Sequence, residues 1–219
     1  MKRQALVLAA ATGAVLLSMV AVSAITGASQ ETHEHYKPAA DYTRDLLAHP
    51  GGLRLLMGLD VAFLVLYTAF FGALAKYLRS TLAWIGFGAM AIVAVLDIVE
   101  DHHILSLLSL AEHARPIDDA SIAFQEALSS TKFSISYLSL FLFGISIPRT
   151  SRLGWVLCLF LTVGNLITAV LGFAAPADWR EALDSSRWIG FLSGFGLAFL
   201  WLRSAPDESS NRNGPHGGL

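Results

Sequence analysis

The sequence predicts an all-α, polytopic membrane protein: a bundle of six transmembrane helices with both termini in the cytoplasm. Three observations indicate this class. Hydrophobic residues make up 54% of the 219 residues and charged residues only 15%, which is too apolar for a water-soluble surface. The apolar residues are gathered in six long stretches. The Lys and Arg residues of the connecting segments fall on alternate sides of these stretches.

The six stretches match the thickness of a membrane. A hydrocarbon core about 30 Å thick takes roughly 20 helical residues to cross. We predict one transmembrane domain over 1–203, with spans at about 5–28, 53–75, 82–101, 133–147, 153–175 and 188–202. The fourth and sixth spans are short, but each continues a polar helix on its outer side. Asp118 is placed to cap the first of these helices, which Pro148 ends, and Asp178 with Glu181 resembles a capping box for the second.

Charge in the loops predicts the orientation. One set of loops carries Lys or Arg and no acidic residue, which is typical of the cytoplasmic side of a bacterial inner membrane. Its basic residues are Lys2, Arg3, Lys76, Arg79, Arg149, Arg152 and Arg203. The opposite loops hold the acidic residues Glu31, Glu34, Asp41, Asp45, Glu112, Asp118, Asp119, Glu126, Asp178, Glu181 and Asp184. We therefore expect a multi-pass inner-membrane protein in contact with the lipid bilayer.

The ends of the chain leave one alternative open. The first span has a basic start, and Val22-Ser23-Ala24 or Thr26-Gly27-Ala28 imitates a signal-peptide cleavage site. Its apolar stretch exceeds the usual ~7–15 residues of a signal peptide, so we favour a retained helix. Cleavage would leave five spans in the same orientation. Residues 204–219, rich in Ser, Asn, Gly and Pro, are predicted to form a disordered cytoplasmic tail.

The first outer loop is expected to contain a short helix on the membrane surface. Pro38 is suited to its first turn, and Tyr42 and Leu46 fall on one face. The run His49-Pro50-Gly51-Gly52 would stop it.

Acidic residues inside the spans are the strongest candidates for a site. An ionisable group at the centre of a membrane helix costs at least ~2.5 kcal/mol on insertion scales, so it indicates function. Asp60 lies in the second span, and Asp97 opens the run Asp97-Ile98-Val99-Glu100-Asp101-His102-His103 at the end of the third. At 100° per residue, Asp97, Glu100 and Asp101 share one side of the helix, with His103 next to Glu100. His102 points elsewhere.

Helical rise places this face level with two other helices. At 1.5 Å per residue, Asp60 lies ~10 Å, Asp97 ~8 Å and Asn165 ~12 Å below the outer boundary. Tyr137 reaches a similar depth. We therefore predict a polar cavity in the outer leaflet, with Lys132, Arg187 and Arg54 at its rim.

Three function classes fit such a cavity. The leading one is the binding or passage of a proton, a cation or a small cationic substrate, because clustered carboxylates share and release protons. The second is a metal-assisted hydrolase of lipid-phase substrates, since Glu100-x-x-His103 has the helical spacing of metal ligands; a divalent metal is then the cofactor. The third is a structural or sensory component in which the acids only form ion pairs. The sequence contains neither an inverted repeat nor a nucleophile paired with a base, so enzyme and transporter both stay open.

The sequence also bears on nucleic acid, disulfides, a second metal site and protein partners. The 15 basic and 17 acidic residues nearly cancel and form no basic patch, which excludes nucleic acid. The single cysteine, Cys158, lies in an apolar run and cannot form a disulfide within the chain. A second candidate metal-binding segment is Glu31-Thr32-His33-Glu34-His35, with His49 nearby. Protein partners cannot be read from the sequence, and a homo-oligomer is compatible with it.

The layout resembles a family of uncharacterised bacterial six-helix membrane proteins, known as a domain of unknown function. The resemblance lies in the segment from Leu53 to Asp60, in the stretch 96–110 with its acidic residue before a Leu/Ser-rich end, and in the closing segment 190–202. It implies the six-helix fold and no particular activity. The chain departs from the family pattern at Asp97 and in the run from Glu100 to His103.

Overall fold

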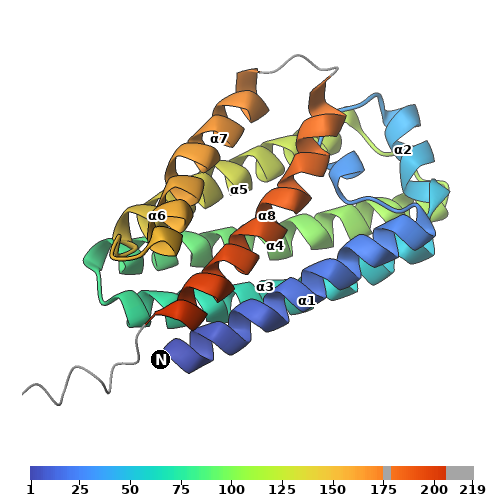
Figure 1. The fold of residues 1–219 in the computed structure, drawn as a ribbon. Coiled ribbons are helices and arrows are strands. Elements are labelled where there is room, and N and C mark those ends of the chain that lie inside the picture. Colours follow the sequence, from blue (N-terminus) through green and yellow to red (C-terminus); the bar gives the residue numbers. More distant parts are fainter. Residues whose placement is uncertain (175–178, 206–219) are drawn as a thin grey trace, which may run out of the picture.

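A computed structural model describes residues 1–174 and 179–205 of the protein, without the side chains of 180–186. Those residues form helices and connecting loops, which confirms the all-α class. The elements are α1 (Lys2–Thr26), η1 (Glu31–His33), α2 (Ala39–Ala48), α3 (Pro50–Leu78), α4 (Thr81–Glu112), α5 (Asp119–Ser146), α6 (Arg152–Leu159), η2 (Phe160–Gly164), α7 (Asn165–Ala174) and α8 (Arg180–Ser204). Figure 1 shows their arrangement.

Five helical segments are long and apolar enough to cross a membrane: α1, α3, α4, α5 and the continuous stretch Arg152–Ala174, which joins α6, η2 and α7. The protein is therefore a multi-pass membrane protein. Large apolar side chains also face outward, including Val65 and Val95, each 59% exposed, which suits contact with lipid and not with water. α8 has 25 residues and covers the sixth predicted span, but it is not among the five.

The long helix predicted to continue the fourth span outward is present as α5. The Asp118 carboxylate caps α5 by accepting a hydrogen bond from the Ser121 backbone N–H at 2.6 Å, and this bond lowers the pKa of Asp118. α5 ends at Ser146, just before Pro148. Asp178 of the second expected cap and most of the predicted tail, 206–219, lie outside the described residues.

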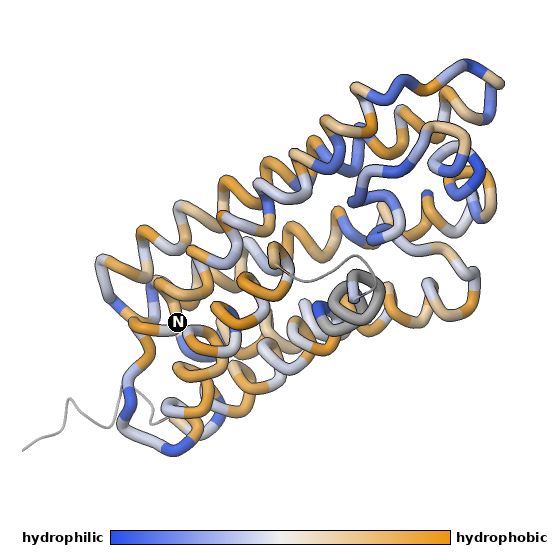
Figure 2. The backbone as a smooth tube through the Cα atoms, turned by 90° about the horizontal axis from the view of Figure 1, so that it is seen from above, coloured by the Kyte–Doolittle hydropathy of each residue, from blue (hydrophilic) through white to orange (hydrophobic). Residues whose placement is uncertain are grey.

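The bundle has two distinct ends. At one, here called the terminal end, Lys2 donates a hydrogen bond to the backbone carbonyl of Ala205, so the start of α1 and the end of α8 lie together (Figure 1). At the other, here called the loop end, lie residues 27–49 and 113–118 (Figure 1). Hydrophilic residues gather at the loop end and apolar residues run along the helices (Figure 2). The long helices pack as neighbours in the pairs α1 with α3, α3 with α4, α4 with α5, and α1 with α8.

The predicted helix of the first loop is α2, which is not simply laid on the membrane surface. Its Tyr42 and Leu46 are fully buried against Leu53 of α3 and Ile104 of α4. The predicted apolar face of the helix is present. It packs against α3 and α4 and so closes the loop end of the bundle.

The terminal half of the bundle has an aromatic core. Phe71 lies 5.1 Å from Phe70 and 4.9 Å from Phe143, measured between ring centroids, and Phe70 lies 5.4 Å from Phe195. These contacts join α3, α5 and α8. At Gly144 the α5 backbone lies so close to η2 that an added Cβ would be 2.8 Å from Thr162 Cγ2. These contacts therefore hold the helices together in the terminal half of the bundle.

Candidate functional site: a buried acidic cluster

The acidic face of α4 points into the protein. Asp97, Glu100 and Asp101 are 8%, 0% and 3% exposed, whereas His102 is exposed and His103 half-buried. The α-helical rotation of 100° per residue puts the three carboxylates on one side, as their spacing predicted. They lie at the interface of α4 with α3 and α5.

A lysine from α5 bridges two of these acids. Lys132 Nζ lies 2.8 Å from Asp97 Oδ1 and also forms an ion pair with the Glu100 carboxylate. Lys132 is 6% exposed, so it is not the rim residue that the sequence predicted. It is drawn inward because two buried carboxylates compensate for the loss of hydration of its ammonium group.

Glu100 has the most complete set of partners. Its Oε1 accepts a hydrogen bond from Ser129 Oγ and one of 3.2 Å from Gln125 Nε2. The Gln125 Oε1 in turn lies 2.7 Å from His103 Nδ1, which then donates. His103 therefore reaches Glu100 through Gln125. Glu100 and His103, the candidate metal ligands, are both bonded to protein groups in this arrangement.

Tyr67 of α3 closes the other side of Asp97. Its hydroxyl donates a 2.9 Å hydrogen bond to Asp97 Oδ2, and Tyr67 is 4% exposed. Asp97 therefore bonds to α3 and α5 at once, which fixes the position of its carboxylate between the two helices.

Asp60 and Asp101 form a pair with different surroundings. Asp60 is 5% exposed, and its carboxyl lies within hydrogen-bonding reach of the Asp101 carboxyl. Gln30 Nε2 donates to Asp101 Oδ1 at 3.3 Å, while Asp101 Oδ2 is buried without a hydrogen-bond partner. Among the described residues, no cation forms an ion pair with either acid. Because ionised carboxylates only accept hydrogen bonds, one acid of this pair must carry a proton for the two to bond to each other.

The first loop covers the cluster. Glu34 is 5% exposed and pairs with Arg187 of α8 at 2.6 Å, and the Arg187 guanidinium lies 4.2 Å from the centre of the Phe133 ring. The loop is held in place by Tyr42, whose hydroxyl donates to the His33 carbonyl at 3.1 Å. Gln30 thus reaches Asp101 of α4, and Glu34 reaches Arg187 of α8, from a segment far away in the sequence.

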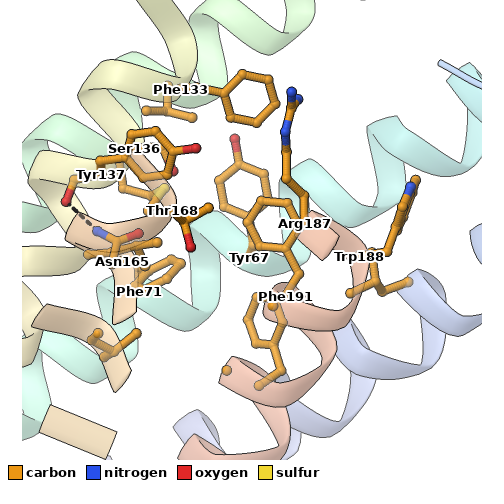
Figure 3. A pocket seen from close by; sticks show the side chains of 18 of the residues that line it. Tyr67, Phe71, Phe133, Ser136, Tyr137, Asn165, Thr168, Arg187, Trp188 and Phe191 are labelled. Atoms are coloured by element: carbon orange, nitrogen blue, oxygen red, sulfur yellow. Dashed lines mark hydrogen bonds between the residues drawn. The ribbon is translucent and has the colours of Figure 1, made fainter. Parts of the chain in front are cut away.

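A cavity of about 300 Å³ lies beside the cluster, and Asp60 and Asp97 line it. Tyr137 and Asn165, the other candidate site residues, also line the cavity. Asn165 Nδ2 donates to the Tyr137 backbone carbonyl at 2.8 Å, so it links α7 to α5 (Figure 3). Asn165 directly follows the π-helical segment η2, an irregularity that is frequent at functional sites.

The described residues do not provide a complete set of ligands for a metal ion. Among the side chains that the structure describes, no group of three or more His, Cys, Asp or Glu is placed to hold a metal ion. In the first-loop run, His33 is buried with its Nδ1 unbonded, and desolvation lowers its pKa to about 4. Its ring packs edge-on against Tyr42, with 5.5 Å between centroids.

Sequence reasoning named Lys132 as a rim residue but missed Gln125 and Ser129, the hydrogen-bonding groups beside Glu100. Gln125, Ser129 and Lys132 follow one another at i, i+4 and i+7, a polar stripe on one face of α5. That periodicity was a usable signal. The contribution of Gln30 had no signal of this kind, because it depends on how the first loop folds back.

No protein-family model, curated protein or solved structure matches the chain. The resemblance to the uncharacterised six-helix family therefore stays a prediction. The fold and the site define a multi-pass helical membrane protein with a buried ionic cluster and an adjoining cavity.

Proposed function

We propose that this protein is a six-span bacterial inner-membrane protein whose acidic cluster binds a proton or a small cation from the periplasmic side. The length and packing of α8 support a sixth span. Its 25 helical residues extend ~37 Å, enough to cross a membrane, and it packs along α1. The start of α1 and the end of α8 meet at the terminal end, as an even number of crossings requires. Arg79 and Arg149 lie in connections at that end, which favours the cytoplasm for it.

The Asp60–Asp101 pair carries the proposal. Five carboxyl groups, those of Glu34, Asp60, Asp97, Glu100 and Asp101, are at most 8% exposed. Among the described residues, the cations that form ion pairs with members of this group are Lys132 and Arg187, and they pair with Asp97, Glu100 and Glu34. Neither Asp60 nor Asp101 has an ion-pair partner among those residues. Burying uncompensated negative charge is unfavourable, so a shared proton or a bound cation would stabilise the pair.

The lining of the cavity favours binding over passage of an ion. From the acids toward the terminal end, the walls are formed by apolar side chains such as Phe70, Leu74, Ile147 and Leu157. A hydrated ion would find little to replace its water there. The supported activity is therefore reversible occupation of a site near Asp60, with exchange between a proton and a cation.

Proton release on cation binding tests this proposal. Methylammonium chloride, added to the purified protein in weakly buffered nanodiscs near neutral pH, should release about one proton per protein as the cation replaces it. Asp60→Asn should abolish the release. Asp118→Asn, at the exposed cap of α5, is the matched control and should leave it unchanged.

Two results would contradict the proposal. Absence of both proton release and binding heat in the wild-type protein would leave an ion-paired structural bundle. A stoichiometric transition metal, found by elemental analysis and lost in Glu100→Gln, would instead support the metal-assisted alternative.

A further inference from the structure

The cavity is much longer than a small cation needs. On α3 its lining begins at Asp60 and reaches Leu74, a helical rise of ~21 Å. Its volume of about 300 Å³ is at the lower end of the range for small-molecule sites. A proton or a methylammonium ion at Asp60 would leave most of this space unused.

The lining changes character along its length. At the loop end it carries polar and charged groups, including Asp60, Asp97, Lys132 and Arg187. Figure 3 shows Arg187 and the Tyr67 hydroxyl at this end, with Phe71 and Phe191 below them. Toward the terminal end the wall is built from Leu74, Met90, Val93, Ile147, Leu157 and Ala198. Such a site matches a molecule with one polar end and one hydrocarbon chain, because apolar walls lose contacts when nothing fills them.

Charge selects the polar end of that molecule. In the part of the chain that the structure describes, the lining contains four acids, Glu31, Glu34, Asp60 and Asp97, against the two cations Lys132 and Arg187. Both cations already pair with carboxylates of the cluster and its covering loop. An anionic head group would meet the excess of carboxylates, whereas an ammonium group brings three donors and a positive charge to Asp60 and its neighbours.

We propose that the cavity binds a single-chain amphiphile from the membrane, with its protonated primary amine at Asp60 and Asp97 and its chain extending toward Leu74 and Leu157. The inference rests on the proposed function and specifies its ligand class. Entry from the bilayer is consistent with the apolar outer surface of the bundle, where Val163 and Val170 are 51% and 62% exposed.

Photo-crosslinking tests where the chain lies. The probe is dodecylamine with a diazirine at the end of its chain, added to the wild-type protein in phosphatidylcholine nanodiscs. We expect cross-links at Leu74, Met90 or Leu157. Unlabelled dodecylamine should compete at least tenfold more effectively than dodecanol or dodecanoate.

Two variants of α8 give a matched comparison. Ala198→Phe places a ring in the apolar part of the cavity and should reduce the cross-links at least fivefold. Leu200→Phe, at a position 48% exposed on the same helix, should leave them unchanged.

The outcomes separate this inference from the proposed function. Cross-links confined to lipid-facing residues such as Val61 would overturn the amphiphile, while methylammonium-driven proton release would still support the cation site. Equal competition by dodecanol or dodecanoate would overturn the amine head group. Loss of both cross-linking and proton release would overturn both proposals.

Discussion

The ammonium group of Lys132 lies between two carboxylates of the neighbouring helix, 2.8 Å from Asp97 Oδ1 and in a second ion pair with Glu100. All three side chains are buried where α4 packs against α5. This pairing provides partners for the cation and two acids, and it leaves Asp60 and Asp101 as the buried acids without an ion pair among the described residues.

Removing the cation should destabilise the bundle strongly. Lys132→Met keeps the length of the side chain and leaves Asp97 and Glu100 without their counter-ion, so we expect a loss of about 3–5 kcal/mol in the free energy of unfolding. Reversible unfolding in mixed micelles would measure it. Lys37→Met breaks an ion pair whose side chains are 27% and 25% exposed, and should cost less than about 1 kcal/mol. Equal effects of the two variants would contradict the buried pairing.

Asp60 and Asp101 should behave as one unit. Asp60→Asn and Asp101→Asn each change one of two neighbouring buried carboxyls, so their effects on unfolding free energy should differ from additivity by roughly 0.5–3 kcal/mol in a double-mutant cycle. Asp118→Asn, at the cap of α5, should be additive with either variant. Additive effects of Asp60→Asn and Asp101→Asn would mean that the two carboxyls do not interact.

The contact of α5 with the π-helical segment should not tolerate a methyl group. Gly144→Ala would place a Cβ 2.8 Å from Thr162 Cγ2 and 3.0 Å from Leu161 Cβ, with an expected loss of about 1–3 kcal/mol. Gly88→Ala on α4 meets nothing within 4 Å and should cause no loss. Thermal unfolding of the two variants checks the comparison. A Gly144→Ala protein as stable as Gly88→Ala would contradict the close approach.

The first loop should loosen in acid. Burial lowers the pKa of His33 from 6.5 to about 4, with Lys37 lowering it further and Asp45 opposing. The unfolded chain therefore takes up this proton at a higher pH than the folded protein does. The contribution of His33 to stability is complete above pH 6.5 and is lost as pH falls toward 4, by up to about 3 kcal/mol.

His33→Phe isolates this effect. The phenyl ring keeps the packing against Tyr42 but cannot take up a proton, so the decline in unfolding free energy between pH 6.5 and 4 should be smaller than in the wild-type protein. Parallel curves for the two proteins over that interval would show that His33 is not buried in its neutral form.

Local regularity explains what the sequence could predict. The shared face of Asp97, Glu100 and Asp101 follows from helical rotation, and the length of α5 follows from Asp118 and Pro148. The inward position of Lys132 does not follow from local pattern, because the basic stem is flexible and its direction is set by carboxylates on another helix. The cover supplied by Gln30 and Glu34 depends on tertiary contacts of Tyr42 and His33.

Infrared spectroscopy of the carboxyl groups tests the central claim most directly, since it would detect the proton that we propose Asp60 and Asp101 share. The wild-type protein at neutral pH should show the carbonyl stretch of a protonated carboxyl group, shifted in heavy water. Asp60→Asn and Asp101→Asn should each remove this band, and methylammonium should diminish it in the wild-type protein. A wild-type spectrum without a protonated carboxyl band, unchanged by methylammonium, would contradict the account.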